Sequence, residues 1–430
     1  MPGESISRVG VLQPLRHRDF RLLWLGTAIS MVGDGFFVIA LAWQVYDLGG
    51  SPAALGAVGA AWTFPVAVLI APGGVLADRV DRRYPMIAGD LVRLVAVAGM
   101  AALSLAGAIS VAWMAGLAFV FGVGDALYLP SFESVIPALV PEDELVQANA
   151  LSQVVSPVAR TLLGPFLGGI IIATAGVGTA FAVEAVTFAV SALAVALISH
   201  RHVRDAELPS PIEDFREGFQ FVRRTRWLWV GLVFTSLAIL CTVGAWDVLI
   251  PFLVKVDLHS GAAALGLVFA AGGVGAGIAA LINGQRGRLP RRALTAYYLA
   301  WAASNAAMAA FGIVAHVWQA LLVAVVAEAT SATQSIYWLT IEYRLVPKKM
   351  LGRVVSLDYM IAVAGLPLSY AIIGPLANLI GARHALIATG LAGALAILVP
   401  IVIPGALTPE TDGSLDEPGG DQQTADPLSA

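Results

Sequence analysis

Twelve long apolar segments constrain this chain more than any other feature of its sequence. Each holds about 20 or more mostly apolar residues, the length that an α-helix needs to cross a bilayer. We predict spans at residues 20–47, 53–76, 85–108, 112–139, 148–173, 178–199, 227–252, 262–284, 293–314, 317–343, 354–380 and 384–404. These runs are too long for barrel strands of about 10 residues, and lipid admits few other structures. The predicted fold class is therefore all-α, a polytopic membrane protein.

The composition supports a membrane protein and excludes several other classes. Hydrophobic residues make up 58% of the 430 residues and charged residues 13%, about half the charged fraction of a soluble domain. The net charge of −4 is small and indicates no nucleic-acid partner. The single cysteine, Cys241, excludes an intrachain disulfide. The first apolar run is too long for a cleavable signal sequence, so we expect a retained span.

Basic residues are concentrated in alternate loops. Twenty-one of the 25 Lys and Arg residues lie before or at the start of span 1, or between spans 2 and 3, 6 and 7, 8 and 9, or 10 and 11. All of these segments are on one side of the membrane if there are twelve spans, and basic loops remain in the cytoplasm. We therefore predict a multi-pass protein of the cell inner membrane with both termini cytoplasmic.

The chain also divides into two related parts. The longest loop separates an N-terminal half, residues 1–203, from a C-terminal half, residues 204–404. Gly164-Pro165 in span 5 recurs as Gly374-Pro375 in span 11. Two parallel six-span halves are a known transporter architecture. Residues 405–430 contain six acids and no base, and we expect a disordered acidic cytoplasmic tail.

Four ionisable residues lie deep in predicted spans: Asp34, Asp125, Arg160 and Glu328. We predict a proton or substrate site at these residues, because an unpaired charge in lipid is costly. A carboxylate that faces a low-dielectric cavity can load and release protons. The alternative is a permanent Asp–Arg bridge with a structural role. Arg160 requires an acid or water, and the expected partner is Asp125 or Asp34.

The loop after span 2 reads Gly74-Val75-Leu76-Ala77-Asp78-Arg79-Val80-Asp81-Arg82-Arg83. An aspartate at the end of the span can cap a neighbouring helix, and the arginines can pair with acids across the halves or with lipid head groups. The loop resembles the signature loop of the major facilitator superfamily, with Asp81 where that family usually has glycine. The resemblance implies a gating motif that braces span 2 against span 11. Its residues would be Gly74, Asp78, Arg79, Arg82 and Arg83.

Span 5 contains Arg160-Thr161-Leu162-Leu163-Gly164-Pro165-Phe166-Leu167-Gly168-Gly169. Positions 160, 164 and 168 share a helix face, the glycines allow close approach of another backbone, and the proline permits a bend. The segment resembles the antiporter motif of drug:proton exporters in the same superfamily, with Arg160 in place of a glycine. The resemblance implies packing against the small residues 273–277 of span 8. The implied motif residues are Arg160, Gly164, Pro165, Gly168 and Gly169; a packing kink with no transport role is the alternative.

Other stretches, including Phe20-Arg21-Leu22-Leu23-Trp24, resemble the branch that contains macrolide and enterobactin exporters, over about residues 15–404. The function we expect is secondary active, proton-coupled efflux of small amphipathic compounds of drug, macrolide or siderophore type by alternating access. An uptake permease of the same fold for a small metabolite is the alternative.

An ATP-driven pump or an enzyme fits the sequence poorly. None of the three lysines stands in a Gly-Lys-Ser or Gly-Lys-Thr of a Walker A motif, and no Gly-x-Ser-x-Gly elbow is present. We expect no ATP, no cofactor, no metal and no catalytic residues. The expected partners are a small-molecule substrate, protons and the lipid bilayer.

Overall fold

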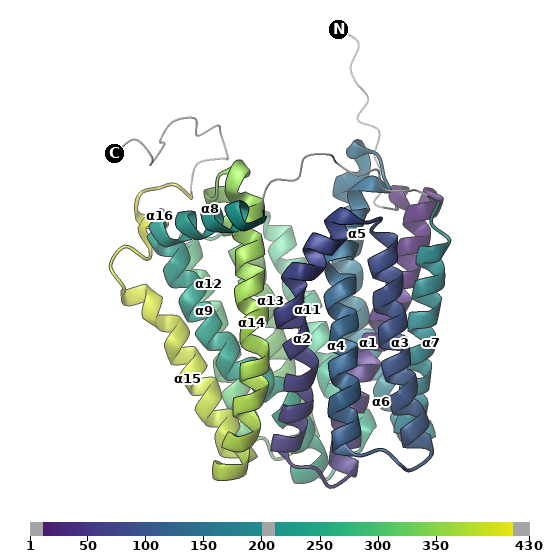
Figure 1. The fold of residues 1–430 in the computed structure, drawn as a ribbon. Helices are drawn as coiled ribbons and strands as arrows, with labels where there is room; N and C mark the ends of the chain where they lie inside the picture. The colour runs from purple at the N-terminus through teal and green to yellow at the C-terminus, as the bar shows by residue number, and fades with distance from the viewer. Residues whose placement is uncertain (1–11, 200–210, 416–430) are drawn as a thin grey trace.

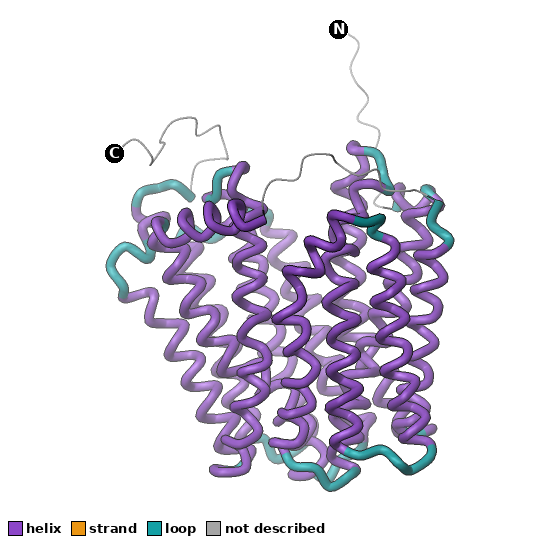
Figure 2. Tube along the Cα trace, viewed as in Figure 1, coloured by secondary structure: helices purple, strands orange, loops and turns teal. Residues whose placement is uncertain are grey.

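The structure, a computed structural model, describes residues 12–199 and 211–415. Within these ranges the chain is almost entirely helical and no strand occurs, which confirms the all-α prediction. Long helices stand side by side, with short loops at both ends of the bundle (Figures 1 and 2).

The N-terminal half has six long helical spans, one of which is interrupted. Its elements are η1 (Gln13–Arg16), α1 (Arg18–Asp47), α2 (Pro52–Arg79), α3 (Arg83–Leu105), α4 (Val111–Val135), η2 (Ile136–Ala138), η3 (Glu142–Glu144), α5 (Leu145–Pro157), η4 (Val158–Leu163), α6 (Gly164–Ala175) and α7 (Val177–Ala196). Together α5, η4 and α6 form the fifth span.

The C-terminal half repeats this plan after an additional short helix. Its elements are α8 (Pro211–Arg224), α9 (Arg226–Gly244), η5 (Ala245–Leu249), α10 (Ile250–Phe252), η6 (Leu253–Asp257), α11 (Ala262–Arg286), α12 (Ala293–Ala310), η7 (Phe311–Ile313), α13 (Val317–Leu345), α14 (Lys348–Ile380), α15 (Ala382–Val402) and α16 (Thr408–Thr411). The segments from α9 to η6 form one span.

Eleven of the helices in the described part of the chain are long and apolar enough to cross a membrane. The remaining predicted span, residues 293–314, corresponds to α12, which packs along α13 and α15. Its composition is more polar because Tyr297, Tyr298 and Asn305 point into the protein, where they are at most 2% exposed. The Tyr297 hydroxyl lies 2.7 Å from the Thr235 hydroxyl. We therefore count α12 as a span too, since its polar groups face helices and not lipid, which gives twelve spans in the described residues.

Local sequence explains where several spans begin and end. The Ser51 hydroxyl accepts a hydrogen bond from the Ala54 amide (3.3 Å) at the start of α2, and Ser110 caps α4 in the same way. Gly176 and Gly381 separate α6 from α7 and α14 from α15 with φ angles of 86° and 85°. Residues with a side chain rarely adopt this conformation, so these tight connections depend on glycine.

The two halves contact each other along two seams. In one seam α2 packs against α14, and in the other α6 and η4 pack against α11. The first seam is tight near the end of the bundle opposite α8 and α16 (Figure 1). There, a methyl group added to Gly374 would lie 2.4 Å from the Ala53 Cα. At the same end, the Tyr46 hydroxyl donates to the Val248 carbonyl (2.7 Å), and Lys255 pairs with Asp47.

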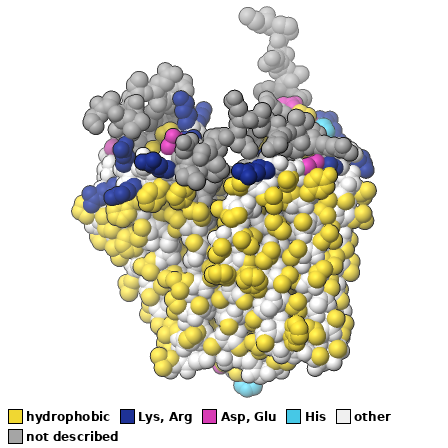
Figure 3. Space-filling view, viewed as in Figure 1, with side chains coloured by type: hydrophobic (Ala, Val, Ile, Leu, Met, Phe, Trp, Pro, Cys, Tyr) yellow, Lys and Arg dark blue, Asp and Glu magenta, His cyan; other side chains and the backbone are white. Residues whose placement is uncertain are grey.

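The described chain begins and ends at one end of the bundle, where η1, α8 and α16 lie (Figure 1). Lys and Arg side chains gather at this end, above a broad apolar band (Figure 3). Such a band is the surface that a bilayer covers, and the basic rim follows the pattern from which we predicted cytoplasmic termini.

Two segments outside the predicted spans are more ordered than the sequence suggested. Part of the predicted linker between the halves forms α8, because Phe215, Phe219 and Val222 recur on one helix face. At the C-terminus, the expected disorder does not include residues 405–415. Glu410 of α16 accepts hydrogen bonds from the amide (2.6 Å) and hydroxyl (2.8 Å) of Thr295. The remainder of the predicted tail lies outside the described residues.

Candidate functional site

The deepest charges of α1 and the fifth span meet inside the N-terminal half. Arg160 donates two hydrogen bonds to Asp34 Oδ2, from Nη2 at 2.9 Å and from Nε at 3.2 Å. The second carboxylate oxygen, Oδ1, is buried without a hydrogen-bond partner. The arginine side chain is 44% exposed and the aspartate side chain 13% exposed. Arg160 is therefore accessible although it lies midway along a membrane span.

A change of helix geometry positions this arginine. Residues 158–163 form a π-helical turn, η4, immediately before Gly164-Pro165. Proline cannot donate the backbone hydrogen bond that the Thr161 carbonyl would otherwise receive, and π turns are frequent at functional sites. The predicted irregularity is present, as a widened turn that contains Arg160.

Asp125 is held by a different arginine. Arg93 Nη1 donates to Asp125 Oδ1 (3.3 Å), and Trp62 Nε1 donates to Oδ2 (2.9 Å). Arg93 also pairs with Asp90, and its guanidinium lies over the Tyr128 ring at 4.2 Å. Of the two expected partners of Arg160, Asp34 is thus correct and Asp125 is wrong. Helix depth placed both acids near Arg160, but Arg93 of α3 lies closer to Asp125.

Glu184 of α7 joins this region, although the sequence did not single it out as a site residue. It is fully buried and accepts a hydrogen bond from the Thr187 hydroxyl (2.9 Å). A methyl group added at Gly33 would lie 1.6 Å from Glu184 Oε2, so the carboxylate rests against α1 next to Asp34. The sequence signal that could have indicated this contact is Gly33, because a glycine next to Asp34 leaves room for a side chain from another helix.

The glycines of the antiporter motif face two different helices. A methyl group added at Gly164 would lie 2.7 Å from the Gly35 Cα, and one at Gly168 would lie 3.0 Å from the Phe36 Cα. Both positions thus contact α1 of the same half. A methyl group added at Gly169 would instead lie 3.0 Å from the Gly266 Cα of α11. The expectation that all these glycines form the surface facing span 8 is wrong for the first two.

The matching surface on α11 includes Gly273 of the predicted stretch 273–277 and extends to Gly266, outside that stretch. A methyl group added at Gly266 would lie 2.5 Å from the Pro165 carbonyl oxygen, and one added at Gly273 would lie 2.8 Å from the Thr161 carbonyl oxygen. Gly275 instead packs against Val325 of α13, and Gly277 has no neighbour within 4 Å. Residues about two turns apart form the seam because they share one face of α11.

Three residues of the gating motif, Gly74, Arg82 and Arg83, contact other residues of the N-terminal half. Arg82 donates to the Ser134 carbonyl, and Arg83 donates to the Ile198 carbonyl (2.6 Å) and pairs with Asp81 (2.7 Å). Gly74 lies near Pro130, and Arg79 is exposed. The side chain of Asp78 lies outside the described residues. The contacts described for Arg82 and Arg83 all lie within the N-terminal half, so in this conformation these two residues do not form the predicted latch between the halves.

Glu328 lies apart from these residues, in the C-terminal half. It borders a cavity of about 300 Å³ between α9, η5, α12 and α13. The four predicted residues therefore form three separate groups: the Asp34–Arg160 pair, Asp125 with Arg93, and Glu328 in its own cavity.

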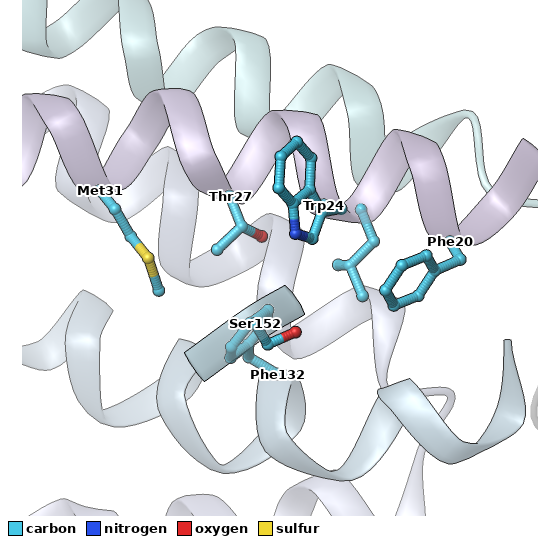
Figure 4. A pocket seen from close by; sticks show the side chains of 7 residues that line it. Phe20, Trp24, Thr27, Met31, Phe132 and Ser152 are labelled. Atoms are coloured by element: carbon cyan, nitrogen blue, oxygen red, sulfur yellow. The ribbon is translucent and has the colours of Figure 1, made fainter. Parts of the chain in front are cut away.

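Two further observations limit which ligands the described residues can hold. A space between α1 and the Phe132 and Ser152 side chains is lined by Phe20, Trp24, Thr27 and Met31 (Figure 4). Its volume of about 10 Å³ accommodates at most a water molecule. Among the described residues, no group of three or more His, Cys, Asp or Glu side chains is arranged to hold a metal ion.

Two named relatives are exporters. Macrolide efflux protein A of Streptococcus pyogenes is 25% identical over 223 residues, 51% of this chain and 54% of that protein, so the chain spans about half the length of this relative. Enterobactin exporter EntS of Citrobacter koseri is 26% identical over 368 residues, 84% of this chain and 85% of that protein.

Among solved structures, a bacterial homolog of the human lysosomal transporter Spinster, inward-facing and unoccupied, matches with a TM-score of 0.68 at 14% identity. The match covers 94% of this chain and 98% of that one, and it shows the shared fold. The family described as transmembrane secretion effector matches residues 9–417. The chain therefore belongs to the transmembrane secretion effector family of major facilitator transporters.

Proposed function

We propose that this transporter is a proton-coupled exporter of small amphipathic compounds in the cell inner membrane, with both termini in the cytoplasm. The observation that carries the proposal is the Asp34–Arg160 pair (2.9 Å), which joins α1 to the fifth span at mid-depth. Export is favoured by the resemblance of span 5 to the antiporter motif and by the two relatives named as exporters.

The pair can link proton movement to a change of packing. While Asp34 is ionised, it holds the guanidinium of Arg160 and so fastens η4 to α1. A proton that neutralises the carboxylate weakens this charge-assisted bond. The freed arginine would then turn towards water or a substrate, and η4, which lies between α1 and α11, could shift against the other half.

Transport would proceed by rocking of residues 1–203 against 204–404 around a site near the midplane. The contacts at the end opposite the termini support this proposal, because Asp47–Lys255 joins the two halves there while Arg82 and Arg83 contact their own half. An uptake permease of the same fold would use the same motion, so the direction of transport requires measurement.

The test is transport in inverted membrane vesicles with an imposed pH gradient, acid inside, for a panel of amphipathic compounds. The wild type should accumulate substrate and release protons from the vesicle lumen. Asp34→Asn and Arg160→Gly should each reduce gradient-driven accumulation at least tenfold, whereas Arg286→Gly, at the end of α11, should not. Wild-type rates and unchanged pH dependence in Arg160→Gly would refute the proposed role of the pair. Accumulation only with the reversed gradient would favour uptake.

A further inference from the structure

The cavity beside Glu328 combines one carboxylate with six apolar or aromatic and five uncharged polar side chains. Its volume of about 300 Å³ is at the lower end of the range for small-molecule sites. The lining residues come from four elements of the C-terminal half. They are Ile239, Thr242, Val243, Trp246, Trp301, Ser304, Asn305, Met308, Ala327, Glu328, Ser331 and Gln334.

The Glu328 carboxylate has no basic partner in this cavity. No lysine or arginine is among the lining residues, and within the described chain the Glu328 carboxylate has neither a hydrogen bond nor an ion pair to the protein. Ion pairs described in this half, Arg353–Glu217 and Arg383–Asp257, lie near helix ends. Asp34 and Asp125 of the N-terminal half each have an arginine, so Glu328 differs from them.

Several neighbouring polar groups of the cavity donate hydrogen bonds to the protein. The Ser304 hydroxyl donates to the Ala327 carbonyl (3.0 Å), and the Asn305 side-chain amide donates to the Trp301 carbonyl (2.8 Å). The Gln334 side-chain amide donates to the Ser335 hydroxyl (3.0 Å). The Asn305 Oδ1 atom has no hydrogen-bond partner, but it is enclosed beside Gly393 of α15. The Glu328 carboxylate is therefore the ionisable group of the cavity that is free to receive a ligand.

Aromatic packing fixes the two indole rings of the cavity. Trp246 meets Phe269 and Phe311 edge to face, with ring centres 5.4 and 5.8 Å apart. Trp301 meets Tyr297 in the same way at 5.7 Å. Rings held in place lose little freedom on binding, and tryptophan is the aromatic side chain that attracts cations most strongly.

We propose that this cavity binds an organic cation, an amine or quaternary ammonium group attached to an apolar body. The cationic group would lie beside Glu328 and the body between Trp246 and Trp301. A half-buried carboxylate without a partner is unfavourable, and a cation of this kind compensates it, whereas an anion is repelled. The inference rests on the proposed function, since it names the substrate class of that transporter.

The test compares two rigid aromatic probes of similar shape and opposite charge on purified, full-length protein in nanodiscs without any gradient. They are radiolabelled methylphenylpyridinium, a cation, and biphenyl carboxylate, an anion. The cation should bind at least tenfold more tightly than the anion. Glu328→Gln should weaken binding of the cation at least tenfold, and Glu328→Asp should weaken it less. Glu342→Gln, which removes a buried acid elsewhere on α13, should leave the cation affinity unchanged.

Equal affinity for the two probes, or tighter binding of the anion, would overturn the inference. So would an unchanged cation affinity in a Glu328→Gln protein that elutes as the wild type does in size-exclusion chromatography. If that variant does not fold, the ratio of the two affinities in the wild type still decides. Cation binding without proton-driven transport would defeat the proposed function alone, while proton-driven efflux of anions without cation binding would defeat this inference alone.

Discussion

Two arginines inside the N-terminal half meet carboxylates in different ways. Arg93 is 3% exposed and lies between Asp90 and Asp125, with the Tyr128 and Phe188 rings at 4.2 and 4.5 Å from its guanidinium carbon. Such an enclosed charge holds α3 and α4 together. Arg160 pairs with one carboxylate and is 44% exposed, so it can exchange that partner for water or substrate.

This difference predicts opposite effects of removing each arginine. Arg93→Leu should lower the free energy of unfolding by about 3–5 kcal/mol, because two buried carboxylates lose their counter-charge. Arg160→Gly should change it by less than about 1 kcal/mol, although transport should fail. Thermal unfolding of the two variants, followed by size-exclusion chromatography, measures the two changes in stability. A stable Arg93→Leu protein would mean that these acids are compensated in another way.

Periodicity and depth identified the charged residues but not all of their partners. A sequence gives the distance of Asp34, Asp125 and Arg160 from the ends of their spans, and the three are at similar depths. The faces that two helices turn towards each other are set by tertiary packing. Depth alone therefore made Asp125 as good a candidate partner of Arg160 as Asp34, whereas the structure places Arg93 beside Asp125. Glu184 was not included as a site residue because it lies off-centre in its span.

The fifth span is packed on two sides, against α1 and against α11. The sequence correctly placed residues 160, 164 and 168 on one face and suggested close helix contacts. The resemblance then assigned that face to span 8, whereas it meets α1, and the adjacent Gly169 meets α11. A repeat of 3.6 residues per turn turns neighbouring glycines towards different helices, which explains how one motif serves two contacts.

The two contacts should respond differently to a single added methyl group. Gly164→Ala would place a carbon 2.5 Å from the Val32 carbonyl oxygen within one half, and such overpacking costs about 1–3 kcal/mol of stability. Gly169→Ala places one 2.8 Å from the Ala262 carbonyl oxygen in the seam between halves, so it should alter the transport rate more than the unfolding temperature. Gly116→Ala, with no neighbour within 4 Å, is the matched control. Equal losses of stability in both seam variants would argue against this division.

At the scale of the whole molecule, the sequence predicted the apolar segments, the number of spans and the position of most loops. The conformation did not, because one sequence encodes every state of a moving protein. The structure has its halves in contact at the end opposite the termini, where Lys255 pairs with Asp47. Lys255 Nζ also donates to the Trp43 carbonyl (3.0 Å) and lies 4.3 Å from the centre of the Trp43 ring.

In the proposed orientation, Lys255 closes the outer end of the transporter. Its ion pair and its cation–π contact together contribute about 1–2 kcal/mol, so Lys255→Ala should raise the outward-open population about 5- to 30-fold. A cysteine at position 42, where Ala42 is 2% exposed, reports this opening once Cys241 is replaced by alanine. Impermeant maleimide added outside should label it faster by the same factor in Lys255→Ala, but not in Lys348→Ala, at the other end. Labelling at the unaltered rate would show that this contact does not hold the outer end closed.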